Sequence, residues 1–295
     1  MKETYSREVR RGYLYAFLAA VCGGVIPTSS KLLLAVASPA AIASWGFLLS
    51  GLVLVPYRPK ALPGRKSLPY VVLFGVLGGA LGPVLYQYGL SSSTAVNASL
   101  LSNGEVLFTA LIAFGLFGER LSRKQLGFGM FIVAGIVAVS TNLELSGIQF
   151  FQGLLGNLLI LASTLAWSAE NNLIVSATQR FGPGLITKFR NMIGGALVLL
   201  VAASLGVQVG VPSSGWVPLA ALAFALAGTS FLAIAALGKI GAVRTILVFS
   251  TTSVFGAVFA LVFLGEQITP VQLSGGAVIL IGVYLFQRNE RKPVA

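Results

Sequence analysis

The chain has 295 residues, of which 56% are hydrophobic and only 9% are Asp, Glu, Lys or Arg. Soluble domains carry roughly 25% charged residues, and a mean hydropathy of +0.89 leaves more apolar surface than a core of this size can bury. The lack of His and the single Cys exclude His-liganded metal sites, His general bases, Cys clusters and intramolecular disulfides. The composition therefore predicts an integral membrane protein without metal or cofactor.

The net charge of +12 could suggest binding to nucleic acid, but the 20 Lys and Arg residues lie in short runs between long apolar segments. Such runs are typical of the loops that set membrane topology. We therefore expect lipid, and not nucleic acid, around this chain.

Ten apolar segments are long enough to cross about 30 Å of hydrocarbon, which takes about 20 helical residues. Each is continuously apolar, so we expect helices and not the alternating strands of a barrel. The first segment follows a basic stretch but lacks a small-residue cleavage site, so we expect it to remain as a helix. The predicted segments are 12–35, 40–57, 69–90, 95–117, 123–141, 153–176, 184–205, 215–238, 242–264 and 271–287.

Basic residues predict the orientation of these segments. With ten crossings, every Lys and Arg except Lys31 falls on the side of the N-terminus. Because positive residues concentrate on the cytoplasmic side, we expect both termini in the cytoplasm and the chain in the inner or plasma membrane of the cell.

The two halves of the sequence resemble each other at an offset of 147 residues, which places Gly118-Glu119 on Gly265-Glu266. This match predicts two five-helix repeats, residues 1–147 and 148–295, within one transmembrane domain. Because five is odd, the second repeat enters the membrane from the opposite side. Inverted repeats are the architecture of alternating-access transporters.

Ten helices as five plus five, the paired Gly-Glu after segments four and nine, and residues 98–109 (ASLLSNGEVLFT) together resemble the drug/metabolite transporter superfamily, specifically its EamA-type exporters. The resemblance covers nearly the whole chain. It implies a secondary transporter in which segments one to four and six to nine surround a central cavity, with five and ten at the periphery. It also implies export of amino acids or other small metabolites.

Two acidic residues, Glu105 and Glu170, lie inside predicted membrane segments, where a carboxylate costs at least about 2.5 kcal/mol unless it has a partner or water. Glu105 could accept a coupling proton, contact a substrate ammonium, or join Asn97 and Asn103 in a packing network. The same alternatives apply to Glu170 with Asn171, and a role at the inner gate is a further one.

Charged residues at segment ends have a different interpretation. Glu119 and Glu266 each follow a glycine and precede Ser or Thr and a new segment, so we expect hinges with a C-cap glycine beside the next helix N-terminus. Arg190 and Arg244 begin segments seven and nine, and we expect topology anchors there. Pairing with Glu170 or binding of a substrate carboxylate is the alternative.

The remaining candidates are small, cyclic or aromatic side chains. Gly75 and Gly79 form a small-xxx-small motif that lets backbones approach closely. Pro27 and Pro83 interrupt segments one and three, and we expect local kinks that free carbonyl groups. Candidate aromatic residues of the cavity are Tyr86, Tyr88 and Trp167.

The inverted repeats favour a secondary transporter that works by alternating access, with a coupling proton as an open alternative, and the family resemblance implies export of amino acids or related amphipathic compounds. The alternative hypothesis is an exchanger or importer of an anionic metabolite that uses Arg190, Arg244 or Lys239. The sequence gives no indication of subunit number. It carries no nucleophile and base constellation of an enzyme and no phosphate-binding lysine motif of an ATP-driven pump, and its internal repeats argue against a channel.

Overall fold

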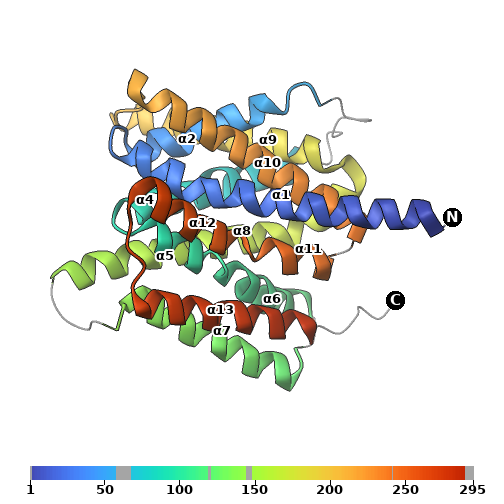
Figure 1. The fold of residues 1–295 in the computed structure, drawn as a ribbon. Coiled ribbons are helices and arrows are strands. Elements are labelled where there is room, and N and C mark those ends of the chain that lie inside the picture. The colour runs from blue at the N-terminus through green and yellow to red at the C-terminus, as the bar shows by residue number, and fades with distance from the viewer. Residues whose placement is uncertain (1, 58–67, 119–120, 144–147, 241, 290–295) are drawn as a thin grey trace.

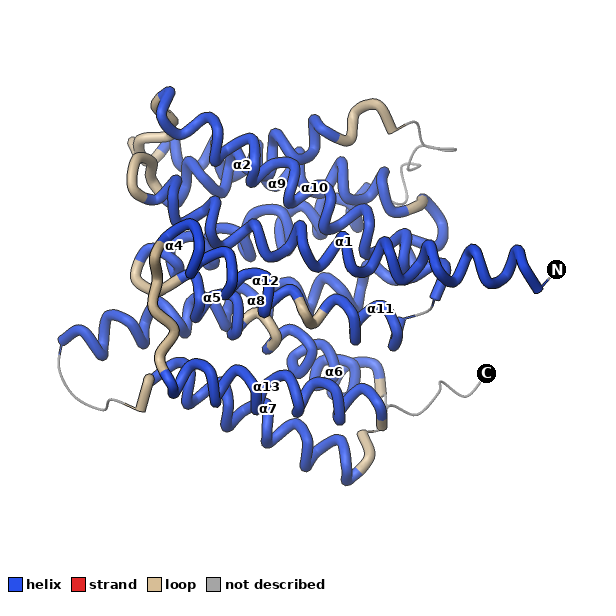
Figure 2. Tube along the Cα trace, viewed as in Figure 1, coloured by secondary structure: helices blue, strands red, loops and turns tan. Residues whose placement is uncertain are grey.

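The computed structural model describes residues 2–57, 68–118, 121–143, 148–240 and 242–289. All regular secondary structure in these residues is helical (Figures 1 and 2). Eight helical segments are long and apolar enough to cross a membrane, and Pro39–Val53 and Thr252–Leu264 are shorter apolar helices. Together they correspond one for one to the ten predicted segments, so the all-α membrane fold class is confirmed.

Six of the spans are single helices, and the eighth follows a short 3-10 turn. The third, fourth and ninth are interrupted. In chain order the elements are α1 (Lys2–Leu34), α2 (Pro39–Val53), α3 (Leu68–Phe74) with a π-helical turn (Gly75–Leu81) and α4 (Gly82–Ser91), α5 (Ala95–Leu101) with α6 (Gly104–Phe117), α7 (Arg123–Thr141), α8 (Ile148–Phe181), α9 (Pro183–Ser204), the turn Ser213–Gly215 with α10 (Trp216–Ile240), α11 (Ala242–Phe249) with α12 (Thr252–Phe259) and a π-helical turn (Ala260–Leu264), and α13 (Pro270–Arg288).

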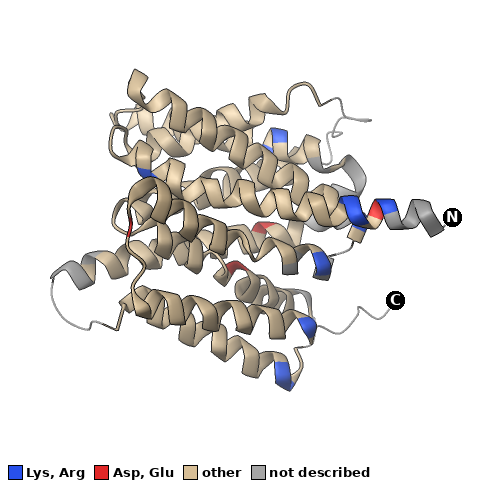
Figure 3. Ribbon diagram, in the orientation of Figure 1, with Lys and Arg blue, Asp and Glu red and all other residues tan. Residues whose placement is uncertain are grey.

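The start of α1 and the end of α13 lie at the same end of the bundle, as an even number of crossings requires (Figure 1). Most of the described Lys and Arg residues gather toward this end, whereas the middle of the bundle is nearly free of them (Figure 3). We call the end of the bundle where α1 starts and α13 ends the termini end, and the opposite end the far end.

The helices of the first half of the chain pack mainly on helices of the second half. α1 packs against α10 and α12, and α2 packs against α9. Both α4 and α6 pack against α8, and α7 packs against α13. The halves are therefore interlocked in one bundle, and no helix pair separates into a domain of its own (Figure 1).

The same local signals shape the helix ends of both halves. Gly118 and Gly265 end α6 and the ninth span with φ of 70° and 66°, the left-handed conformation in which glycine has no steric penalty. Ser122 with Gln125, and Thr269 with Gln272, then form capping boxes at the starts of α7 and α13. Each pair of positions is 147 residues apart, so equivalent residues build equivalent turns.

Candidate functional site

The fourth span is two helices rather than the continuous helix that hydropathy predicts. α5 ends at Leu101 and α6 begins at Gly104, with Ser102 and Asn103 between them. Glu105 therefore lies in the first turn of α6. A negative charge is stabilised there, because the first N–H groups of a helix are positively polarised.

One face of α8 presents polar side chains to this break. Ser168 Oγ donates to the Glu105 carbonyl oxygen at 3.0 Å, and Asn171 Nδ2 donates to the Glu105 carboxylate at 2.5 Å. Asn172 Nδ2 donates to the Thr109 carbonyl oxygen at 3.1 Å. Residues three and four apart share a helix face, so α8 and α6 are joined by a row of hydrogen bonds inside the apolar bundle.

The neighbouring face of α8 carries a buried ion pair. The Glu170 carboxylate lies 2.6 Å from Nε of Arg190 on α9, and the two side chains are 2% and 15% exposed. Each charge offsets much of the other's cost of burial. The guanidinium also lies 5.9 Å from the centre of the Phe47 ring, within the range of a cation–π contact. The pairing that the sequence left as an alternative for Arg190 is the one found.

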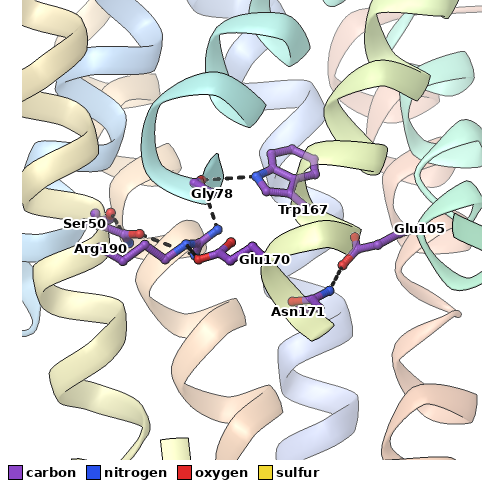
Figure 4. A network of polar contacts seen from close by, with 8 residues as sticks. Ser50, Gly78, Glu105, Trp167, Glu170, Asn171 and Arg190 are labelled. Atoms are coloured by element: carbon purple, nitrogen blue, oxygen red, sulfur yellow. Dashed lines mark hydrogen bonds and ion pairs between the residues drawn. The ribbon is translucent and has the colours of Figure 1, made fainter. Parts of the chain in front are cut away.

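A backbone carbonyl of the third span completes this cluster (Figure 4). Gly78 O accepts hydrogen bonds from Trp167 Nε1 at 3.2 Å and from Arg190 Nη2 at 3.0 Å. Both donors point at one oxygen atom from different helices, α8 and α9. The guanidinium is thus held from two sides, by the Glu170 carboxylate and by this carbonyl.

The Gly78 carbonyl is available because of a proline five residues later. In the π-helical turn the Gly82 N–H bonds to the Leu77 carbonyl, five residues back. The next donor in this pattern would be residue 83 bonding to Gly78, but Pro83 has no N–H. The expected freed carbonyl is therefore present, and side chains of α8 and α9 bond to it.

Glycines of the third span allow the approach of α8 and α9. A Cβ atom on Gly78 would lie 1.6 Å from a Glu170 carboxylate oxygen, and one on Gly79 would lie 2.4 Å from the Arg190 carbonyl oxygen. Gly75 lies against α9 in the same way. No larger residue fits at these positions without displacing the ion pair or the helix that carries it.

The three candidate aromatic residues take two different positions. Tyr86 is buried, and its ring centre lies 5.7 Å from that of Trp167. Tyr88 is 41% exposed, because two residues turn a helix by about 200°. Tyr86 and Trp167 thus adjoin the cluster from the side of α4, and Tyr88 faces away from Tyr86.

The network of Asn97 and Asn103 with Glu105, considered from the sequence, is not the one found among the described residues. Asn103 Nδ2 donates to the Leu100 carbonyl oxygen at 3.2 Å, and Asn97 accepts from Gln272 Nε2 of α13 at 2.8 Å. The break in the fourth span separates the residues, so each amide bonds locally or to the nearest other helix.

Glu266 and Lys31 form hydrogen bonds near the start of α5, at the far end of the bundle. The two carboxylate oxygens of Glu266 accept from the N–H groups of Ala95 and Val96 at 2.9 and 3.0 Å. Glu266 therefore caps α5, in the other half of the chain, and not the next helix in sequence as we expected. Lys31 Nζ donates to the Leu90 carbonyl oxygen at 3.0 Å, just before α5.

The remaining candidates lie apart from the cluster. Pro27 is buried within α1, which continues through it. Glu119 lies outside the described residues. Arg244 is exposed near the start of α11, and Lys239 pairs with Glu8 at the termini end.

The sequence reasoning missed three polar residues beside the cluster: Ser50, Ser168 and Asn191. Asn191 Nδ2 donates to Ser50 Oγ at 2.8 Å between α9 and α2, and both side chains are buried. A polar side chain inside an apolar segment was the signal that could have identified them, because polar side chains in a membrane form hydrogen bonds with neighbouring helices.

The EamA-like transporter family matches the chain twice, over residues 10–141 and 154–288. A protein of Methanothermobacter thermautotrophicus named uncharacterized transporter is 28% identical over 302 residues, which cover 94% of this chain and 86% of that protein. The uncharacterized transporter YyaM of Bacillus subtilis is 25% identical over 260 residues, which cover 83% of each chain. One crystal structure has the same fold, with a TM-score of 0.69 and 18% identity over 96% of this chain and 98% of that one.

Proposed function

Since the chain belongs to the EamA-like transporter family, and is a transporter and not an enzyme, we propose that it exports amino acids or related amphipathic compounds by alternating access. The family resemblance drawn from the sequence is confirmed by the match over both halves, and so is the fold of two inverted five-helix repeats. We assign residues 1–147 and 148–295 to these repeats.

The observation that carries the proposal is an intramembrane carboxylate without a cationic partner. Among the described residues, Glu170 pairs with Arg190, whereas the side-chain partner of Glu105 is the neutral amide of Asn171. An acid beside a broken helix within the membrane is typical of substrate and ion sites in transporters. A substrate ammonium or a coupling proton would supply the positive charge that Glu105 lacks.

The neighbouring ion pair suits the other end of a zwitterion. A guanidinium has five N–H donors, and Glu170 and the Gly78 carbonyl use only part of this set on Arg190. A substrate carboxylate can bond to the remaining donors. The paired rings of Tyr86 and Trp167 offer an apolar surface to the rest of an amphipathic molecule.

The inverted halves support the proposal of alternating access. Because equivalent helices run in opposite directions, an exchange of conformation between the two halves would close one end of the bundle and open the other. The glycine contacts of the third span against α8 and α9 supply smooth surfaces for this movement.

An exchanger or importer of an anionic metabolite is less well supported. Arg190 and Lys239 already have the carboxylates of Glu170 and Glu8 as partners. Arg244 is exposed and begins α11 at the termini end, away from the cluster. An anionic substrate at the remaining donors of Arg190 would bring no positive charge to the nearby Glu105 carboxylate, whose side-chain partner among the described residues is the neutral amide of Asn171.

We also propose that both termini are cytoplasmic and that the chain lies in the inner or plasma membrane. The gathering of Lys and Arg at the termini end (Figure 3) supports this orientation. A reporter fused after Asn142 should be outside, and one fused after Glu290 inside. Reporters on the same side would contradict it.

The transport proposal is tested by exchange between equal substrate pools in proteoliposomes, over a panel of amino acids, nucleosides and organic anions. We expect saturable exchange of zwitterions. If Glu105 contacts the substrate ammonium, exchange should fall at least tenfold in Glu105→Gln, about 1.4 kcal/mol. The matched control Glu8→Gln, which removes an acid at the termini end, should exchange normally.

The same variant separates the two roles of Glu105. If Glu105 contacts the ammonium, Glu105→Gln weakens binding of zwitterions at every pH. If it carries the coupling proton, exchange survives and only the stimulation by a pH gradient is lost. Exchange of organic anions alone would refute the substrate class.

A further inference from the structure

The structure assigns a binding site for an anionic phospholipid to the outer surface of the bundle, at a groove between α1, α11, α12 and α13. This site is independent of the proposed substrate and of the cluster around Glu105. An apolar groove for an acyl chain lies directly below three exposed arginines that suit a phosphate group.

The groove has a volume of about 530 Å³ and is lined by Phe17, Val248, Thr251, Val254, Phe255 and Tyr284. Its walls are rings and branched aliphatic side chains. The Thr251 hydroxyl lies between α11 and α12 and is already used, because it donates to the Val248 carbonyl oxygen at 2.6 Å. An occupant would thus meet apolar atoms, as the acyl chain of a lipid requires.

Helix periodicity places one arginine above the groove on each of three helices. Arg244 precedes Val248 by four residues on α11, and Arg288 follows Tyr284 by four residues on α13. Four residues return to nearly the same helix face after about 6 Å. Both arginines therefore lie one turn beyond the groove, toward the termini end.

The third arginine comes from α1. Arg10 precedes Phe17 by seven residues, two turns on the same face and about 10 Å toward the termini end. α1 packs against α11, and α11 packs against α13, so the three arginines belong to adjoining helices. Figure 3 shows basic residues at the termini end of these helices.

Among the described residues, no carboxylate forms an ion pair with these three arginines. Arg10, Arg244 and Arg288 are exposed, and within the described part of the chain the ion pairs are those of Arg11, Arg190 and Lys239. A lipid phosphate sits just outside the hydrocarbon, with its acyl chains below it. The arginines lie nearer the termini end than the groove does, so they match the position of the phosphate while the groove matches that of the acyl chains.

The same charges disfavour a second copy of the chain as the occupant. In a two-fold dimer within the membrane, the identical face of each copy would meet, and three arginines would stand opposite three more. An anionic headgroup neutralises this charge, whereas a second copy doubles it.

The test uses the purified full chain in detergent and native mass spectrometry, with added phosphatidylglycerol or phosphatidylcholine of identical acyl chains. We expect the parent to retain phosphatidylglycerol more strongly, and Arg244→Gln to weaken that retention about fivefold, the effect of one basic residue near a membrane surface. The matched control Lys188→Gln removes the same charge from α9, which packs against α2 and α10, and should leave retention unchanged.

Two further measurements locate the lipid. Val254→Trp, which fills the groove at an exposed position, should lower retention of both lipids. A phosphatidylglycerol with a photoreactive acyl chain should label peptides within residues 244–259. Equal retention of the two lipids by the parent, an equal loss in Lys188→Gln, labelling elsewhere, or crosslinks between two copies would each overturn the assignment.

Discussion

The fourth and ninth spans share a backbone break but not its chemistry. The two breaks lie within one residue of equivalent positions at the offset of 147, because α6 begins at Gly104 and α12 begins at Thr252. In the fourth span the Glu105 side chain reaches across to α8. In the ninth the Thr252 hydroxyl, at the position equivalent to Glu105, donates across the break to the Phe249 carbonyl oxygen of its own span at 2.6 Å.

The difference teaches that the repeat sets the shape of the bundle while single residues set its function. Two broken helices give two possible sites near the centre of the membrane. The break in the fourth span carries the Glu105 carboxylate and the break in the ninth carries the Thr252 hydroxyl, whereas the ion pair of Glu170 and Arg190 lies between α8 and α9, beside the third span. Only one of the two breaks therefore carries charge, and the predictions below test this asymmetry.

The largest effect is expected from removing one partner of the ion pair. Arg190→Gln leaves the Glu170 carboxylate buried without its cation, and we expect a loss of about 3 kcal/mol or more in the free energy of unfolding. Thermal unfolding in detergent measures it. The double variant with Glu170→Gln should regain stability without regaining transport. Equal unfolding of the parent and Arg190→Gln would mean that the pair contributes nothing.

A single methyl group at Gly78 should disturb the ion pair of Glu170 and Arg190 nearly as much as the loss of Arg190 does. Its Cβ would lie 1.6 Å from a Glu170 oxygen, so Gly78→Ala must displace the carboxylate. We expect transport to fall at least tenfold, about 1.4 kcal/mol. The control is Gly115→Ala on α6, where an added Cβ meets nothing within 4 Å. Similar transport by the two variants would rule out the close approach.

A smaller effect is expected where the ninth span ends and the fourth begins. Glu266→Gln keeps the size of the side chain but removes the charge that accepts from Ala95 and Val96. Loss of a charged helix cap costs about 1 kcal/mol, which is a decrease of a few degrees in Tm. A decrease in transport with no change in Tm would show that Glu266 belongs to the transport site instead.

The smallest effect is expected at the uncharged break. Thr252→Ala removes a hydroxyl whose hydrogen bond in the described part of the chain stays within the ninth span, so we expect transport within about twofold of the parent, a difference under about 0.5 kcal/mol. The same exchange assay measures it. A loss of transport in Thr252→Ala as large as that in Glu105→Gln would show that the two breaks are functionally equivalent.

The ten spans and the repeat could be predicted from the sequence, because hydropathy and an offset of 147 residues are properties of long stretches. The breaks could not, since neither the Ser102-Asn103 turn nor its counterpart at Ser250-Thr251 contains a proline or a charge. They depend on bonds to other helices, such as those from Ser168 to α6. These partners are distant in sequence, so the residues around the break give no local signal.

The individual site residues show the same limit. Glu105 and Glu170 stand out as acids among apolar residues, and the freed carbonyl could be inferred from Pro83. The identity of that carbonyl depends on the π-helical turn, which shifts the missing bond from Gly79 to Gly78. The capping of α5 by Glu266 required knowing that the two halves interlock.

The contact between α7 and α13 has a consequence for the origin of the chain. A Cβ on Gly135 of α7 would meet Ile279 of α13 at 2.6 Å, and one on Gly282 of α13 would meet Ile132 of α7 at 2.9 Å. Each residue of one contact lies 147 positions from its counterpart in the other, so the interface is self-complementary, as between identical subunits. Two identical five-helix units in inverted orientation would form this same contact, so the interface between α7 and α13 keeps the geometry expected of a duplicated and fused half.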